Sequence, residues 1–130
     1  MKASRILALG LATTFALGVG SAQAASSAGE KLFQRKCSTC HKLDKNAVGP
    51  ELTGIIGRKA GSVADFKRYK AMKGAKFTWD EKLLDEWIAN PRKFLKEHAD
   101  IVGGKSTSMV VKIKKEKERQ AIIDYLKTAK

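Results

Sequence analysis

Two cysteines and a histidine stand together at Cys37-Ser38-Thr39-Cys40-His41, and this short run constrains the fold more than any other part of the chain. Residues three apart lie on one face of a helical turn, so both thiols can reach one edge of a flat macrocycle. The adjacent imidazole can then bind a metal at the centre of that macrocycle from one side. Cys-x-x-Cys-His is the attachment pattern of a c-type haem. It predicts one covalent haem c per chain, bound through Cys37 and Cys40, with His41 as an axial ligand.

Other uses of paired cysteines must be weighed against haem. A Cys-x-x-Cys pair can be a dithiol redox centre or part of a zinc site, and in an exported protein it can be a disulfide. The chain has only two cysteines and two histidines, Cys37, Cys40, His41 and His98, and their spacing matches no ordinary zinc finger. No convincing strand pattern supports a thioredoxin-like fold. A disulfide closing so short a loop would add little stability. Haem attachment is therefore favoured.

The first 24 residues have the organisation of a secretory signal peptide. Lys2 and Arg5 give a positive start, the apolar run 6–20 is short and broken by glycine and threonine, and residues 22–24 (Ala-Gln-Ala) match a cleavage site. We expect cleavage after Ala24, which removes 24 of 130 residues and leaves a 106-residue exported domain, 25–130. The alternative is an uncleaved membrane anchor. The short run and the well-formed cleavage site disfavour a permanent anchor.

Residues 25–130 predict a single all-α domain with three main helices. The first is expected to begin at a capping box over 27–30 and to run into the cysteines. The second is expected to begin near Thr78, with Glu81 completing a capping box, and to end at Pro91. The third is expected over 115–128. The inward faces are predicted to carry Leu32, Phe33, Leu83, Leu84, Trp87, Ile88, Ala121, Ile122, Tyr125 and Leu126.

The segment between the first two helices is rich in glycine and is predicted to form loops and turns. Such a loop-rich domain has few apolar side chains of its own. A large flat apolar cofactor at its centre would supply the missing core, so the haem is expected to be structural as well as functional.

Downstream of the haem motif, several segments resemble class I c-type cytochromes. They are 48–61 (VGPELTGIIGRKAG), 77–81 (FTWDE), 87–91 (WIANP) and 118–127 (ERQAIIDYLK), in the order that the family has them. The resemblance covers nearly all of 25–130 and is closest to soluble bacterial carriers of the cytochrome c2 kind, related to mitochondrial cytochrome c. It implies the class I cytochrome c fold, with helices and loops wrapped around one covalent haem. It also implies a periplasmic location, because bacteria attach such haems outside the cytoplasm.

The resemblance implies roles for single residues near the cofactor. The backbone carbonyl of Pro50 would hold the second ring nitrogen of His41 and fix its orientation. Arg58 and Trp79 would donate hydrogen bonds to a buried haem propionate, since a carboxylate out of water needs charged or donating partners. Taken without the resemblance, Arg58 would be a solvated cation and Trp79 a core residue.

The resemblance also implies a close crossing of the first and last helices. Gly29 and Phe33 would meet Tyr125 there, with glycine permitting the approach. One departure from the family lies in the loop: where relatives often have a tyrosine that bonds the propionate, this chain aligns Arg68, with Tyr69 beside it.

Of the three methionines, only Met109 occupies the family's position before the last helix, and the resemblance makes it the second axial ligand to iron. A thioether favours ferrous iron, so a His41/Met109 pair would hold the reduction potential high. A methionine at this spacing can also be a flexible core filler. The lead-in 103–108 and the extra segment 96–100 depart from the family pattern, and His98 in that segment is a rival ligand.

The chain is strongly basic, with a formal net charge of +13 that falls to +11 when Lys2 and Arg5 are removed. Nucleic-acid binding is not expected, because no recognition helix or aromatic–basic platform is present. Lysines around an exposed haem edge would instead steer the protein to acidic docking faces of membrane redox complexes, in transient and salt-sensitive contacts. The alternative is a basic surface that serves solubility only. The lysines concerned are Lys36, Lys42, Lys45, Lys105, Lys112, Lys114 and Lys115.

The resemblance thus implies a monomeric monohaem carrier of single electrons between periplasmic or membrane-bound redox complexes, such as a bc-type complex and a reaction centre or terminal oxidase. With both axial positions filled, no substrate can bind the iron, and no enzyme activity is expected. A dedicated acceptor for one periplasmic dehydrogenase is a variant of this reading. The alternative from another class is a haem protein with a labile or histidine sixth ligand, acting in peroxidase chemistry or ligand sensing.

Overall fold

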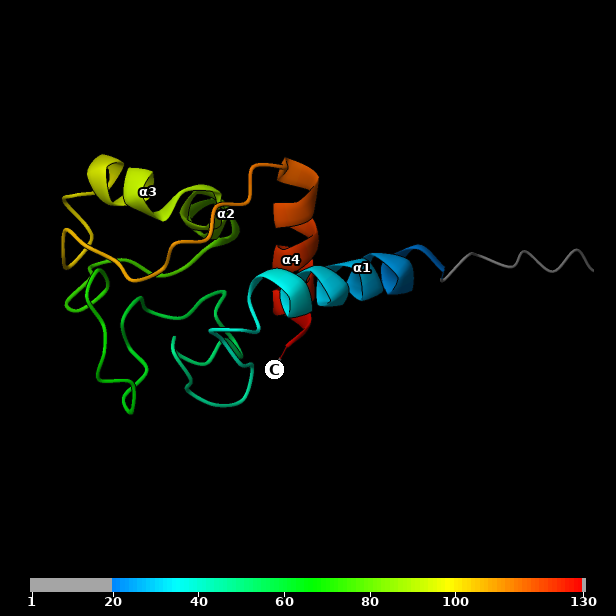
Figure 1. Cartoon of the computed structure of the whole chain (residues 1–130), viewed down its shortest axis with the longest axis horizontal. Coiled ribbons are helices and arrows are strands. Elements are labelled where there is room, and N and C mark those ends of the chain that lie inside the picture. Colours follow the sequence, from blue (N-terminus) through cyan, green and yellow to red (C-terminus); the bar gives the residue numbers. More distant parts are fainter. Residues whose placement is uncertain (1–19, 130) are drawn as a thin grey trace, which may run out of the picture.

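The structure is a computed structural model and describes residues 20–129. It contains four helices, α1 (Gly20–Lys36), α2 (Glu81–Ala89), α3 (Pro91–Glu97) and α4 (Glu116–Thr128). Between residues 20 and 129 there is no strand, and one isolated antiparallel bridge joins Lys59 to Thr78. Figure 1 shows α1 and α4 crossing on one side of the molecule, α2 and α3 on the other, and long loops below α2 and α3. The predicted all-α architecture is confirmed.

The first helix begins earlier than predicted. It runs from Gly20, so Ser27 lies inside the helix rather than at its cap, and the predicted capping box is wrong for this chain. The stretch before Ser27 is rich in alanine, the best helix former, so the helix extends back through it. Leu32 and Phe33 are buried as predicted. Residues 1–19 of the predicted signal peptide lie outside the described residues. None of the helices within 20–129 combines the length and apolar character needed to span a bilayer.

The second helix is capped by a different residue from the one predicted. Asp80, not Thr78, is the N-cap of α2: its backbone is extended and its carboxylate accepts a hydrogen bond from the Leu83 N–H at 2.7 Å. Aspartate is as good a cap as threonine, and choosing between two nearby cap residues requires the backbone dihedrals.

A fourth helix, α3, is absent from the sequence prediction. Pro91 ends α2 as expected, but it also occupies the first turn of α3, where a missing N–H costs nothing. Asn90 serves both helices. Its N–H donates to the Glu86 carbonyl, and its side chain accepts from the Lys93 N–H at 3.2 Å. Asn-Pro is a sequence signal for a helix start, and it could have predicted α3.

The crossing of α1 and α4 depends on a glycine. A Cβ at Gly29 would overlap the Ala121 carbonyl oxygen and lie 2.8 Å from the Tyr125 Cβ. One turn further along, the Phe33 and Tyr125 rings pack with their centroids 5.6 Å apart. The predicted meeting of these residues is therefore present. It holds the end of α1, and the cysteines that follow it, against α4.

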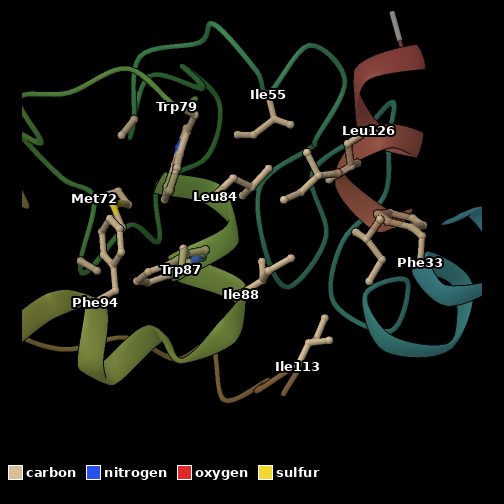
Figure 2. Packing of buried hydrophobic residues seen from close by; sticks show 14 of the residues in the cluster. Phe33, Ile55, Met72, Trp79, Leu84, Trp87, Ile88, Phe94, Ile113 and Leu126 are labelled. Atoms are coloured by element: carbon tan, nitrogen blue, oxygen red, sulfur yellow. The ribbon is translucent and has the colours of Figure 1, made fainter. Parts of the chain in front are cut away.

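The buried apolar residues form one cluster, which Figure 2 shows from close by. Trp79, Trp87 and Phe94 gather beside α2 and α3, with Phe94 centroids 6.0 Å from Trp79 and 5.4 Å from Trp87. Phe33 and Leu126 lie at the crossing of α1 and α4. Most residues predicted to face inward are buried, although Leu83, Ala121 and Tyr125 are only half-buried. Ile123, which was not in the predicted set, is fully buried.

The segment between α3 and α4 is fixed at two places. At its end, Arg119 donates to the Asp85 carboxylate at 2.8 Å and to the Ile113 carbonyl at 3.0 Å, which joins α4, α2 and the segment. At its start, the N–H groups of Gly103 and Gly104 donate to the Ala71 carbonyl at 2.8 and 3.0 Å. These contacts fix the position of Met109, which lies between them.

Candidate haem site

The cysteines lie on a turn that continues α1. Cys37 N–H donates to the Phe33 carbonyl and His41 N–H donates to the Cys37 carbonyl, both at 2.8 Å. Both thiols are free, with Cys37 half-buried and Cys40 exposed. Burial raises the pKa of Cys37 to about 11. A redox-active dithiol needs a lowered thiol pKa, so this environment does not support the dithiol alternative.

His41 is oriented by the loop that follows it. Its Nδ1 lies 2.8 Å from the Pro50 carbonyl oxygen, so the N–H is on Nδ1 and the Nε2 lone pair is available for a metal. The His41–Pro50 contact is the one predicted. Burial lowers the pKa of His41, although the hydrogen bond to Pro50 opposes it, and the imidazole is neutral at pH 7. Gly49 lies against the ring: a Cβ there would be 2.6 Å from both ring nitrogens.

His98 lies in a different environment. Its Nε2 is 2.7 Å from a carboxylate oxygen of Glu86 on α2, and its ring packs on Phe94 with centroids 4.3 Å apart. In the part of the chain that the structure covers, no three His, Cys, Asp or Glu side chains form a group that could hold a metal ion. The zinc alternative therefore has no ligand set.

Arg58 and Trp79 are neighbours, joined through their backbones. Trp79 N–H donates to the Arg58 carbonyl at 2.9 Å, and Trp79 is buried. The Arg58 guanidinium donates to the carboxylate of Glu51 at 2.5 Å and to the carbonyls of Glu51 and Thr53 at 2.7 and 3.0 Å. Sequence reasoning did not single out Glu51. The sequence feature that could have identified Glu51 is an acidic residue directly after Pro50, in the same loop as Arg58, the arginine predicted to bind the propionate.

Where relatives often have a tyrosine that bonds the propionate, this chain has Arg68 followed by Tyr69. Of these two residues, Tyr69 faces the interior. Arg68 is exposed, donates to the Ala47 carbonyl and lies over the Phe66 ring, 5.6 Å from its centroid. Tyr69 is half-buried, and its hydroxyl accepts a hydrogen bond from the Val63 N–H at 3.3 Å. A shift of one residue thus restores a tyrosine to the interior.

Met109 is half-buried and packs against the apolar core. Its N–H donates to the Thr107 hydroxyl at 3.0 Å, and its side chain borders a small pocket with Pro91 and Arg92 at the start of α3. Met72, by contrast, is buried within the core near Phe94. His41 contacts Gly49 and Pro50, whereas Met109 lies beside the start of α3. Ligation of one iron by both residues is a proposal.

These residues fit a covalently bound haem. Two free thiols three positions apart are followed by a neutral imidazole whose Nε2 has no protein partner among the described residues. Gly49 keeps the space beside the ring clear on one side.

Comparison with known proteins identifies the family. The family model described as Cytochrome c matches residues 26–130. The chain belongs to the cytochrome c family. It is 39% identical to a cytochrome c2 of Rhodopseudomonas palustris over 112 residues, which cover 78% of this chain and 96% of the relative. It is 38% identical to a cytochrome c of Chlamydomonas reinhardtii over 104 residues, which cover 78% of this chain and 86% of that protein.

Solved structures agree with this assignment. Cytochrome c2 from Rhodospirillum centenum superposes with a TM-score of 0.66 at 37% identity, covering 80% of this chain and 97% of that one. Cytochrome cH from Methylobacterium extorquens superposes with a TM-score of 0.62 at 38% identity, covering 79% and 97%. The predicted recognition, fold class and haem c cofactor are confirmed. The family consists of electron carriers rather than enzymes, so the non-enzymatic, monohaem electron-transfer class is confirmed as well.

Proposed function

We propose that this cytochrome shuttles single electrons in the periplasm, with its haem attached through Cys37 and Cys40 and ligated by His41. The observation that carries the proposal is the turn after α1: two free thiols are followed by a neutral imidazole, held by Pro50, with Nε2 unused. When bound, the haem supplies a one-electron ferric/ferrous couple. The chain's own part is to hold the imidazole at a fixed angle through Pro50 and to exclude water with its apolar core.

Met109 is the sixth ligand in this proposal. It stands half-buried at the family's position, whereas Met72 is packed into the core. His98 is engaged by Glu86 and Phe94, which disfavours it as a ligand. With both axial positions filled by protein, the iron would exchange electrons without binding substrate. No observation favours the peroxidase or sensing alternative.

Arg58 and Trp79 are proposed to hold one haem propionate. The support is that the two residues are adjacent and that Arg58 is largely buried, with 18% of its side chain exposed. A buried carboxylate needs a charged donor within reach, because it loses its hydration.

The proposed partners are acidic faces of membrane redox complexes. The seven lysines predicted to surround the haem edge are all exposed, and Val110 beside Met109 is 75% exposed. An exposed apolar side chain flanked in sequence by lysines suits brief, steered encounters. We further propose that residues 1–24 direct export and are cleaved after Ala24, and that residues 25–130 act as a monomeric domain.

The test of the proposed ligands is visible spectroscopy of the purified holoprotein. In Met109→Ala, the absorption band that reports sulfur bound to ferric iron is expected to disappear. In His98→Ala and in the control Met72→Leu, the band is expected to remain. A band that persists in Met109→Ala would make another methionine the ligand. A wild-type protein that lacks the band, with a spectrum that changes in His98→Ala, would make His98 the ligand instead. Colourless purified protein, or a pigment that acid–acetone extracts, would overturn covalent attachment.

A further inference from the structure

The positive charge of Arg58 is already paired within the protein. Glu51 Oε1 lies 2.5 Å from Arg58 Nη1, and the two side chains are only 25% and 18% exposed. Charges shielded from water interact more strongly than surface charges, since less solvent screens them. Because the pair has no net charge, the electrostatic field in this part of the site is not that of an arginine alone.

The same contacts leave one edge of the guanidinium unused. Nη1 donates to Glu51 Oε1 and to the Thr53 carbonyl, and Nη2 donates to the Glu51 carbonyl. A guanidinium has five N–H donors, so Nε–H and the second Nη2 proton remain, with no hydrogen-bond partner among residues 20–129. Nε and Nη2 lie on one edge of the guanidinium. Carboxylates commonly bind arginine through two such parallel N–H groups, which makes this edge suitable for a propionate.

Glu51 is held firmly in the loop that orients the axial imidazole. It directly follows Pro50, and its own N–H donates to the Asn46 side chain at 2.9 Å. Both members of the pair also act electrostatically on the Tyr69 hydroxyl. Burial raises the pKa of Tyr69, while the Val63 N–H and Arg58 lower it and Glu51 raises it. Glu51 is thus held at its backbone by Asn46 and at its carboxylate by Arg58.

We propose that Glu51 is a positioning residue that sets the midpoint potential of this cytochrome. Its carboxylate fixes Arg58 with the unused edge directed at a haem propionate, and its negative charge lowers the potential. The proposal rests on the proposed function, since it requires a haem propionate at Arg58. Reduction adds one electron from a donor protein to the iron, and no bond forms or breaks. A fixed negative charge nearby disfavours that added electron and so stabilises the ferric state.

The test is a redox titration of the purified holoprotein. Glu51→Gln keeps the size of the side chain and an oxygen for Arg58 but removes the charge. It is expected to raise the midpoint potential by about 30 mV or more, which is a roughly threefold shift in the ferric/ferrous equilibrium at 59 mV per tenfold. Glu51→Asp keeps the charge and should remain nearer the wild type. The matched control is Glu97→Gln, whose side chain is 53% exposed and whose charge water screens.

A potential in Glu51→Gln that is unchanged, lowered or equal to that of Glu97→Gln would overturn the proposal. If Glu51→Gln fails to assemble, Glu51→Asn gives a second measurement. It also removes the charge and must raise the potential, so a potential at or below that of the wild type would also overturn the proposal. The visible spectrum distinguishes failure of this inference from failure of the proposed function. An unchanged midpoint potential with a wild-type spectrum would refute only the role of Glu51. Loss of covalent haem from the wild-type protein defeats the proposed function.

Discussion

At the scale of single residues, the candidate site depends on close contact between His41 and the loop after it. The ring is held on one side by the Pro50 carbonyl at 2.8 Å and bordered by the backbone of Gly49. The Gly49 N–H donates to the Cys40 carbonyl at 2.7 Å, which ties the loop to the cysteine turn. Glycine is needed at position 49 because any side chain there would overlap the His41 imidazole.

We therefore expect Gly49→Ala to damage the haem site. The new methyl group would lie 2.6 Å from both ring nitrogens of His41, so the loop or the ring must move. The expected cost is about 1–3 kcal/mol of folding stability. Thermal unfolding of the holoprotein and the intensity of its visible bands measure the effect. The adjacent Val48→Ala, at a residue 59% exposed, is the control. Equal melting temperatures and spectra for the two variants would contradict this account of Gly49.

At the scale of secondary-structure elements, short segments are fixed by caps and backbone contacts. Helices α2 and α3 share Asn90, which ends one and begins the other. The segment 101–104, which follows the extra segment 96–100, lies along the loop 70–76: the Ala71 carbonyl accepts from Gly103 and Gly104, and the Lys76 N–H donates to the Ile101 carbonyl at 2.8 Å. The segment therefore links α3 to the glycine-rich loop.

Removing the shared cap should destabilise α3. Asn90→Ala loses the side-chain oxygen that accepts from the Lys93 N–H, at an expected cost of about 1 kcal/mol. Chemical denaturation of the holoprotein measures this as a lower midpoint with an unchanged slope. Arg92→Ala, at an exposed position in the same turn, is the control and should be nearly neutral. If both variants unfold at the same denaturant concentration, the cap contributes nothing.

The segment 101–104 should also tolerate no side chain at Gly103. A Cβ there would overlap the Lys73 carbonyl oxygen and lie 3.2 Å from the Ala75 nitrogen. We expect Gly103→Ala to cost about 1–3 kcal/mol and to separate the segment from the loop. Hydrogen exchange should then be faster at the Lys76 amide, whose partner is the Ile101 carbonyl. Ser106→Ala, at an exposed position, is the control. Unchanged exchange at Lys76 would show that the contact is not needed.

At the scale of the whole molecule, charge dominates the surface. The formal net charge is +13, and the seven lysines predicted to border the haem edge are exposed. Some are partly neutralised: Lys36 lies 3.4 Å from a Glu118 oxygen and Lys115 lies 3.8 Å from the other. Lys105 and Lys112, on either side of Met109, have no ion-pair partner within residues 20–129. They are the best candidates for long-range attraction of an acidic partner.

Electron transfer to an acidic redox partner should therefore slow steeply as salt is added. Between 0.01 M and 1 M ionic strength the screening length falls from about 30 Å to about 3 Å, so we expect the second-order rate constant to fall by roughly tenfold or more. Lys105→Gln with Lys112→Gln should lower the rate at low salt and flatten the dependence. Lys31→Gln with Lys82→Gln, exposed on α1 and α2, is the charge-matched control. A rate constant that does not change with salt would leave the basic surface with a role in solubility only.

Much of the site follows from local sequence. Cys37, Cys40 and His41 are consecutive on one turn, so their chemistry needs no tertiary information. The crossing of α1 and α4 at Gly29 was also predictable, because the family pattern includes both helices. The predictions for the start of α1 and the cap of α2 were wrong, and α3 was not predicted. Each depends on which of several competing local signals the rest of the chain allows. The free energies of alternative helix caps differ by only about 1 kcal/mol.

The sequence by itself determined the covalent chemistry, the helical class and the basic surface, because these depend on residue identity and on spacing within a few residues. Only the tertiary structure decided which charged and polar groups meet across the chain. It paired His98 with Glu86, brought Tyr69 rather than Arg68 to the interior, and placed Glu51 against Arg58. The physical reason is that such pairings depend on how the loops fold back on each other, and hydrophobic spacing along the chain carries no information about which polar side chains the packed core brings together.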